Sequence, residues 1–572
     1  MKETIKKYLV PVIISFYSLL VGLFFIALRI NYAGISKFLG ADTNQSFIVM
    51  YLPIIVCVII WLVFIYSLFG IYKYKEKRLH TFITLGLNIL FTIAIVVIII
   101  FGSQDYLDFI LPHFYRSLLI TTIILLFGFI LFFPIINKDK KILGVKAVIL
   151  VLVINCAIII GYKLRSNKID QDAVVYAVED EYQIVFSTSD NSLAWVEIGD
   201  NKYYDLYAGS MKSKDLVHKI SVPMSVLDEA KEYTIYAEKM IYRGPFGAYK
   251  GKIISKSHEF RPVDISDGFK YYTLSDIHES YDGAIAAASF HKDMDMLVIL
   301  GDTVSMVEFH ENANASNYVA NKITSGEIPV VYARGNHEIK GEFAEDLYKY
   351  VGSKDQKFYY TFRLGKDVAG IVLDMGEDHD DDWWEYFDSA RFDSYRDEQT
   401  QLLKKLLSDN YFDGYKYKMV VCHIPLTFVN SRHNHEKYKK EWTDIINQMN
   451  IDILLSGHQH DITAFEPHLI KANEELTYNS NYVGVEGKKY KGYLLDFNFY
   501  GFLVGRCSNS QLGDTKPHGT KEYTGLLVDV KFALGSKKEI VTYTNANGET
   551  VKVCNIFGSD DFRSNYDLDL KY

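Results

Sequence analysis

Five short motifs in the second half of the chain carry side chains that could bind metal ions. Each follows an apolar run and contributes aspartate, asparagine or histidine. The motifs are Asp276-Ile277-His278, Gly301-Asp302, Gly335-Asn336-His337-Glu338, His423 and Gly457-His458-Gln459-His460. Carboxylate, amide and imidazole groups suit two adjacent divalent metals, and paired metals are used to attack phosphorus esters. Each motif alone is weak, whereas five in this order within about two hundred residues are strong evidence.

Apolar runs directly before these motifs predict the strands that position them. The expected strands are 271–275, 296–300, 330–333, 418–422 and 451–455. Near-continuous apolar strands indicate a sheet that is buried on both faces. Ligands of open α/β sheets bind at the carboxyl ends of the strands, and every candidate side chain falls there. The sequence therefore predicts an α/β domain with a metal site at one edge of its sheets.

The motifs resemble those of the calcineurin-like metallophosphoesterase superfamily over about residues 268–465. The resemblance implies seven metal ligands in two groups that share a bridging residue. These are Asp276, His278 and His460 for one metal, Asn336, His423 and His458 for the second, and Asp302 between both. The glycines at 301, 335 and 457 are expected to let the backbone turn sharply before a ligand. Two divalent ions are the expected cofactors, and Mn, Fe, Zn or Co all fit oxygen and imidazole ligands.

The same resemblance implies hydrolysis of a phosphomonoester or phosphodiester. A water shared by two cations has a lowered pKa, so metal-bound hydroxide would attack phosphorus. His337 takes the place of the family histidine beside the leaving oxygen, as general acid or transition-state stabiliser. Arg334 and Glu338 are expected to serve the turn or its packing. Many family members orient the catalytic histidine with an aspartate where this chain has Ser305, so the partner of His337 is left open.

Purple acid phosphatases differ from this chain in two motifs. Their first motif lacks a metal-binding histidine, which is His278 here, and they have a tyrosinate ligand at the position of Ser305. The segment Gly376-Glu377-Asp378, which belongs to the acidic run 376–382, and the segment Tyr395-Arg396 look similar to segments of bacterial esterases related to these enzymes. An acidic run is usually a solvated loop. A wall of the substrate cleft is the expected role, with no part assigned to single residues.

The N-terminal part of the chain predicts a membrane anchor. Five apolar runs have about the length needed to cross the hydrocarbon core. They cover 9–28, 47–72, 81–101, 117–136 and 142–162. Basic loops alternate with loops poor in Lys and Arg, which places the N-terminus inside and the catalytic part outside the cell. We therefore expect a five-helix transmembrane domain at 1–165, a multi-pass location in the cell membrane, and the lipid bilayer as a partner.

The intervening segment 172–263 has short runs of alternating polarity, which predict a β-sandwich. It resembles the fibronectin-III-like domain that precedes the catalytic domain of purple acid phosphatases. The catalytic domain would then span 264–572. The expected fold class is multi-domain: a transmembrane helical bundle, a β-sandwich, and an α/β metallophosphoesterase built as a two-sheet sandwich flanked by helices. Strand-like runs at 492–497 and 525–530 are expected to complete the second sheet.

These features together predict a membrane-anchored phosphoesterase with two metals and a phosphate-ester substrate. The net charge of −9 gives no reason to expect nucleic acid as a partner. One alternative is a membrane sensor or binding protein with a phosphoesterase-like ectodomain, and the filled set of ligand positions argues against it. Another is a transporter with an accessory hydrolase, which would need ionisable groups at membrane depth.

Overall fold

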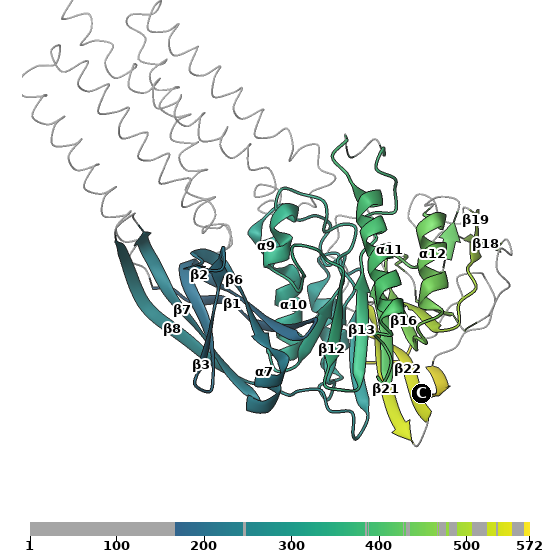
Figure 1. The fold of residues 1–572 in the computed structure, drawn as a ribbon, viewed down its shortest axis with the longest axis horizontal. Coiled ribbons are helices and arrows are strands. Elements are labelled where there is room, and N and C mark those ends of the chain that lie inside the picture. The colour runs from purple at the N-terminus through teal and green to yellow at the C-terminus, as the bar shows by residue number, and fades with distance from the viewer. Residues whose placement is uncertain are drawn as a thin grey trace, which may run out of the picture. The chain divides into compact units, whose positions relative to one another are not determined.

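The computed structural model describes two large β-sheets that pack face to face, with helices on their outer faces (Figure 1). The described residues are 166–243, 247–383, 386, 388–426, 428–430, 435–460, 462–465, 467, 476–479, 489–505, 523–533, 536–551 and 565–571.

The larger sheet has twelve strands and a parallel centre. Its strands are β1 (Ile169–Val178), β2 (Glu181–Ile198), β3 (Asn201–Tyr204), β6 (Asp215–Pro223), β7 (Glu232–Arg243), β8 (Ala248–Glu259), β9 (Phe269–Leu274), β10 (Met296–Ile299), β11 (Pro329–Tyr332), β21 (Thr524–Ala533), β22 (Ser536–Asn545) and β23 (Asn565–Lys571). The order is β23-β22-β21-β9-β10-β11-β1-β2-β7-β8, and β3 and β6 also pair with β2. Strands β9, β10, β11 and β1 run parallel.

The smaller sheet has six strands, of which β13, β14, β16 and β20 run parallel. Its order is β12 (Tyr360–Leu364), β13 (Val368–Leu373), β14 (Tyr417–Cys422), β16 (Ile453–Ser456), β20 (Tyr500–Leu503) and β17 (Thr463–Phe465). Separate small pairings join β15 (Phe428–Asn430), β19 (Lys489–Leu494) and β18 (Leu476–Asn479), and β4 (Leu206–Tyr207) with β5 (Met211–Lys212). The helices are α7 (Met224–Ala230), α8 (Tyr281–Ser289), α9 (His310–Ala313), α10 (Ala315–Thr324), the 3-10 helix η2 (Ala344–Lys349), α11 (Phe392–Ser408) and α12 (Glu436–Ile446).

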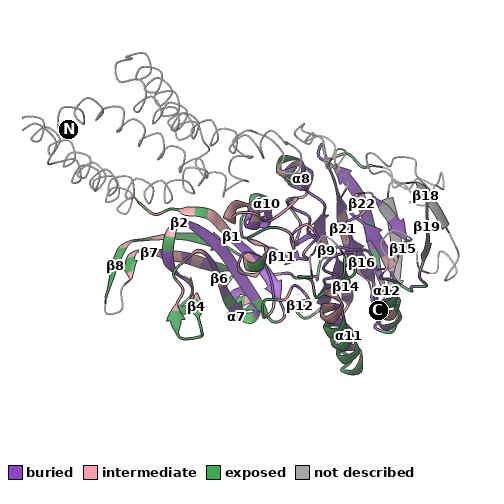
Figure 2. Cartoon of the chain, turned by 90° about the horizontal axis from the view of Figure 1, so that it is seen from above, coloured by how far each residue is buried: buried purple, intermediate pink, exposed green. Residues whose placement is uncertain are grey.

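The core lies between the sheets and beneath the helices. The hydroxyls of Tyr271 on β9 and Tyr417 on β14 lie 2.8 Å apart and join the two sheets across their interface. On the outer face of the smaller sheet, Trp442 of α12 is fully buried and donates from its indole Nε1 to Thr400 of α11 at 2.8 Å. Buried residues line the central strands of both sheets, whereas β8 is largely exposed at the edge (Figure 2). The site-bearing strands are therefore held rigidly from both faces.

The five strands predicted before the motifs are confirmed as β9, β10, β11, β14 and β16. All residues of β10, β11 and β16 are buried, as continuous apolar runs require. The run at 525–530 was assigned to the wrong sheet, because β21 pairs with β9 in the larger sheet. The run at 492–497 was also misassigned, since β19 belongs to the small sheet with β15 and β18.

The predicted fold class needs correction, because the described residues form sheets with flanking helices and include no membrane-spanning bundle. The longest helix in the described ranges, α11, has 17 residues and carries charged side chains such as Arg396 and Lys404. Nowhere in the described part of the chain is a helix long and apolar enough to cross a membrane. The predicted five-helix domain at 1–165 lies outside the described residues. The predicted location outside the cell depends on those segments and stays a prediction.

The separate β-sandwich of the predicted fold class is not observed either. Strand β1 pairs in parallel with β11, so that Val175 lies opposite Pro329 and Tyr176 opposite Val330. Strands from the predicted sandwich thus extend the sheet that carries the metal-site motifs. The physical reason is that an unpaired edge of β11 would leave backbone groups unsatisfied, and β1 meets them.

A buried carboxyl group between the sheets predicts a pH-dependent stability. Glu539 on β22 is fully buried, and burial, reinforced by Asp452, raises its pKa from 4.5 to about 8. In the unfolded chain Glu539 would ionise near its ordinary pKa. The contribution of this group to the free energy of folding therefore favours the folded state at low pH. That contribution is lost as the pH rises from about 4.5 to about 8 and amounts to a few kcal/mol.

We expect Glu539→Gln to raise the melting temperature relative to the unmodified chain at about pH 9 and much less at about pH 5. Glutamine is nearly isosteric and stays neutral, so the cost of ionising a buried group disappears. Thermal melts of both proteins across this range measure the difference. A shift of equal size at both ends would show that ionisation of Glu539 has no part in it.

Candidate metal centre

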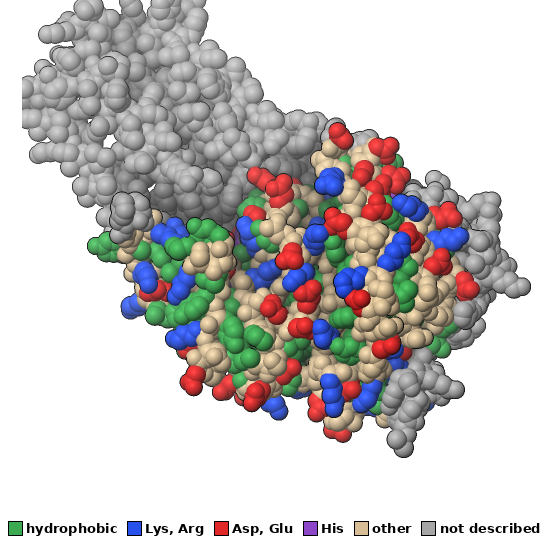
Figure 3. All heavy atoms as spheres, in the orientation of Figure 1, with side chains coloured by type: hydrophobic (Ala, Val, Ile, Leu, Met, Phe, Trp, Pro, Cys, Tyr) green, Lys and Arg blue, Asp and Glu red, His purple; other side chains and the backbone are tan. Residues whose placement is uncertain are grey.

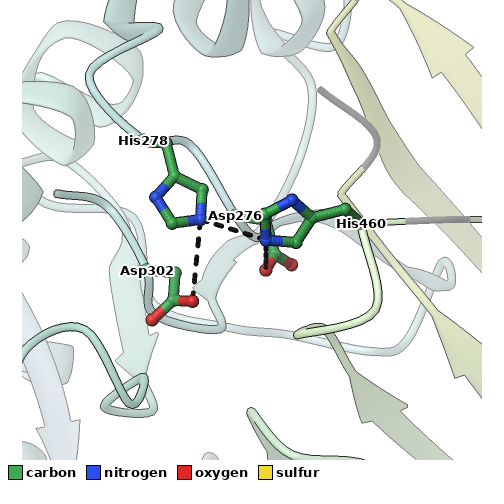
Figure 4. A group of neighbouring side chains, drawn as sticks. All are labelled: Asp276, His278, Asp302 and His460. Carbon is green, nitrogen blue, oxygen red and sulfur yellow. Dashed lines mark hydrogen bonds and ion pairs between the residues drawn. The ribbon is translucent and has the colours of Figure 1, made fainter. Parts of the chain in front are cut away.

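Four of the predicted metal ligands converge at the carboxyl ends of β9, β10 and β16. They are Asp276, His278, Asp302 and His460, and their ligand atoms all lie within 4.8 Å of one another. Figure 4 shows the four side chains pointing toward a common centre. His460 Nε2 lies 3.1 Å from His278 Nε2 and 3.3 Å from Asp276 Oδ1. We call these residues the first cluster.

The remaining predicted ligands form a second cluster that shares Asp302 with the first. Ligand atoms of Asp302, His423 and His458 lie within 4.8 Å of one another. The amide oxygen of Asn336 lies 3.2 Å from His423 Nε2 and 3.1 Å from His458 Nδ1. His423 faces the centre with Nε2 because its Nδ1 lies 2.6 Å from the backbone carbonyl of Leu300. The structure thus brings together all seven residues that the sequence analysis singled out as ligands.

The shared oxygen, Asp302 Oδ2, is the focus of both clusters. It is buried and accepts no hydrogen bond from a described donor, yet three imidazoles surround it. The Nε2 atoms of His423, His278 and His337 lie 3.1, 3.7 and 4.0 Å from it. A buried carboxylate oxygen that faces several nitrogen ligands is suited to bridge two cations.

Three of the four ligand imidazoles are held neutral, whereas Asp302 and Asp276 outweigh burial and raise the pKa of His423 to about 10. Burial is the main cause that lowers the pKa of His278 and His458 below the usual value and that of His460 to about 3. Neutral imidazoles are the form that binds metal. Burial opposes the charge on Asp302, but His423 and other imidazoles outweigh it and hold the pKa of Asp302 well below its usual range. The residues therefore fit two divalent metals with oxygen and imidazole ligands.

The turns that carry the ligands have unusual backbone geometry. Left-handed φ angles occur at Asp276 (51°), Asp302 (49°) and His458 (70°), a conformation that costs energy for residues other than glycine. The expected role of the glycines holds at Gly301, where φ is +83°. Glycine at 335 serves close approach instead, because a Cβ there would lie 2.1 Å from Asp302 Oδ1.

Glu338 and Arg334 have structural roles around these turns. Glu338 is buried and its carboxylate accepts from the backbone N–H groups of Asp302 at 2.8 Å, Thr303 at 2.7 Å and Gly335 at 3.0 Å. It thereby ties the turn after β10 to the turn after β11. Arg334 forms an ion pair of 2.7 Å with Asp374 and packs its guanidinium over the Phe358 ring.

The partner of His337, which the sequence left open, is a backbone carbonyl. His337 Nδ1 lies 2.9 Å from the carbonyl oxygen of Ser305, so Nδ1 donates and Nε2 faces Asp302. Glu279 holds this carbonyl in place, because its carboxylate accepts from the backbone N–H of Ser305 at 2.7 Å and from the hydroxyl at 2.9 Å. No side-chain pattern could have revealed an acceptor that belongs to the backbone.

Ser305→Ala is therefore expected to change kcat only slightly. The substitution keeps the carbonyl that orients His337 and removes only the hydroxyl, so the loss should stay well below the roughly 10²-fold that an essential hydrogen-bond partner costs. Steady-state kinetics of the variant measure this. A loss of that size or larger would show that the Ser305 hydroxyl, and not its carbonyl, supports His337.

Two residues of the acidic run contact the metal ligands, and the sequence predicted no individual role for either. Glu377 and Asp378 are buried, with 2% and 4% of their surfaces exposed, whereas Asp382 farther along the loop is exposed. The Asn336 amide nitrogen donates to Glu377 at 2.9 Å, and His458 Nε2 lies 3.0 Å from Asp378. The sequence signals were the similarity of this segment to bacterial esterases and its place a few residues after strand β13, and the run of charges obscured both.

The residues that carry both clusters match a known protein family. The family model described as calcineurin-like phosphoesterase matches residues 269–461, a span that contains both clusters. Residues 269–461, about a third of the chain, are thus similar to calcineurin-like phosphoesterases. The chain is a phosphoesterase, an enzyme of the hydrolase class, and the resemblance to this superfamily is confirmed. A search of curated proteins finds no match.

Solved structures similar to this chain include a purple acid phosphatase and PhoD. Purple acid phosphatase PPD1 from seeds of yellow lupin (Lupinus luteus) has 12% identity and a TM-score of 0.43, covering 66% of this chain and 72% of that chain. PhoD has 11% identity and a TM-score of 0.38, covering 69% of this chain and 88% of that chain. Similarity at this level carries no conclusion about substrate.

Proposed function

We propose that the phosphoesterase binds two divalent metal ions and hydrolyses a phosphomonoester or a phosphodiester. The observation that carries the proposal is the sharing of Asp302 by two clusters of ligands. The first ion would be held by Asp276, His278, Asp302 and His460. The second ion would be held by Asp302, Asn336, His423 and His458. Ions bound there would neutralise phosphate charge and activate water for attack on phosphorus.

His337 is proposed as the group that protonates the leaving oxygen. Its Nδ1 is occupied by the Ser305 carbonyl at 2.9 Å, so only Nε2 is left to face the reacting group. The backbone N–H of His337 donates to Asp302 Oδ1 at 3.0 Å, which fixes the imidazole relative to the bridging carboxylate. A protonated Nε2 held beside the leaving oxygen would lower the barrier by general acid catalysis.

Metal-dependent turnover of two model esters tests the proposed function. The full-length chain is stripped with a chelator, reloaded with Mn, Zn, Fe or Co, and assayed with p-nitrophenyl phosphate and bis-p-nitrophenyl phosphate. We expect stripping to abolish hydrolysis and at least one metal to restore it, and the preferred ester identifies the substrate class. Hydrolysis that survives stripping, or its absence with every metal, would contradict the proposal.

A further inference from the structure

Glu377 and Asp378 lie at the base of the loop that connects β13 to α11. Acidic side chains gather at the tip of this loop in the solvent (Figure 3). Glu377 and Asp378 belong to the same run but are buried behind the second cluster. Burial of two adjacent carboxylates costs free energy unless each has a charged or hydrogen-bonded partner. Their partners therefore indicate what they do.

Glu377 fixes the orientation of the Asn336 amide. A carboxylate can only accept, so the amide nitrogen of Asn336, 2.9 Å from Glu377 Oε1, must face it. The amide oxygen then points to His423 and His458. Lys340 Nζ lies 3.0 Å from the other oxygen of Glu377 and balances its charge. Without Glu377, the amide could turn its nitrogen toward the metal position, where it cannot serve as a ligand.

Asp378 fixes the tautomer of His458. Its Oδ2 lies 3.0 Å from His458 Nε2 and accepts the proton of that nitrogen. The lone pair is thereby left on Nδ1, which faces the Asn336 oxygen at 3.1 Å. A carboxylate that accepts from the outer nitrogen of a ligand histidine sets its orientation and raises its basicity.

Helix α11 holds both acids in place. Arg396 is fully buried and donates from Nε to the Met375 carbonyl at 3.0 Å and from Nη2 to the Glu377 carbonyl at 2.5 Å. Gln399 Oε1 accepts from the Asp374 backbone N–H at 2.8 Å, and its Nε2 donates to the Asp374 carbonyl at 2.6 Å. Arg396 Nη2 also donates to the His379 carbonyl at 3.2 Å, so the loop backbone is held both before and after the two carboxylates.

We propose that Glu377 and Asp378 are positioning residues that set the affinity of the second metal ion and not of the first. The inference rests on the proposed two-metal function. The first cluster has a support that lies outside the acidic loop and the second cluster, because Asp276 accepts from the Ser275 hydroxyl at 2.6 Å. Loss of either Glu377 or Asp378 should therefore weaken binding of the second metal ion and leave binding of the first unchanged.

Titration of the stripped full-length chain with Mn²⁺, followed by calorimetry and electron paramagnetic resonance, tests this inference. Glu377→Met and Asp378→Leu remove the acceptors, and we expect the second ion to bind about 10- to 100-fold more weakly while the first is unchanged. At intermediate Mn²⁺ these variants should show the six-line signal of isolated ions, where the unmodified chain shows a coupled pair. Asp382→Asn, on the exposed part of the same loop, is the matched control.

Two conservative variants keep the test decisive if the larger changes prevent folding. Glu377→Gln and Asp378→Asn retain an acceptor oxygen without the charge, and we expect a weakening of the second ion by up to about 10-fold. Wild-type affinity for both ions in all folded variants, or equal weakening of both ions, would overturn the inference. Failure of the unmodified chain to bind two ions would instead count against the proposed function.

Discussion

Replacing Asp302 by asparagine is expected to lower kcat/KM by at least about 10³-fold. The substitution keeps the size of the side chain but removes the negative charge at the oxygen that both clusters share. That oxygen lies 3.1 Å from His423 Nε2 and 3.7 Å from His278 Nε2. Both ions would lose a common ligand, so metal content should fall together with turnover. Steady-state kinetics on the preferred model ester and elemental analysis of the purified variant measure the two effects.

An exposed aspartate provides the control for this experiment. Asp293 pairs with Lys270 at the surface, and its side chain is 68% exposed. Asp293→Asn should leave turnover and metal content unchanged. If Asp302→Asn stayed within about tenfold of the unmodified enzyme, the catalytic centre would have to lie elsewhere.

Replacing His337 by glutamine is expected to lower kcat by about 10²- to 10⁴-fold without loss of metal. His337 lies beside the clusters with Nε2 at 4.0 Å from Asp302 Oδ2, and glutamine cannot supply a proton there. The loss should depend on the leaving group. Esters of weakly acidic alcohols need the proton and should lose most, whereas dinitrophenyl esters leave as stable anions and should lose little.

Kinetics with a series of aryl and alkyl phosphates measures this dependence. His291 stacks on Tyr272 and belongs to neither cluster, so His291→Gln is a suitable control. An equal loss for all leaving groups would assign His337 to binding of the transition state through charge alone. Unchanged kcat for every ester would remove it from the mechanism.

The metal-site residues could be predicted because their signals are local. Buried parallel strands must be apolar along their whole length, so the end of each run marks where a side chain can reach the site. Asp276 follows β9 in this way, and His423 directly follows β14. The order of the motifs along the chain is then enough to predict which residues share a metal ion.

The features that could not be predicted depend on pairings across long stretches of the chain. Val175 meets Pro329 through a parallel pairing that neither segment encodes by itself, so the sandwich was taken for a separate unit. Burial of Glu377 within an acidic run follows from Arg396 and Asn336, which are distant in sequence. The acceptor for His337 is a carbonyl, and every residue has one.

The number of metal ions bound by the purified full-length chain tests the two-metal centre most directly. The stripped protein is reloaded with Mn²⁺, freed of unbound metal by gel filtration, and analysed for manganese and protein in the same sample. The two clusters that share Asp302 predict two ions per chain, and Asp302→Asn should bind fewer. A count of one or none in the unmodified chain would contradict the assignment of these seven residues as a two-metal site.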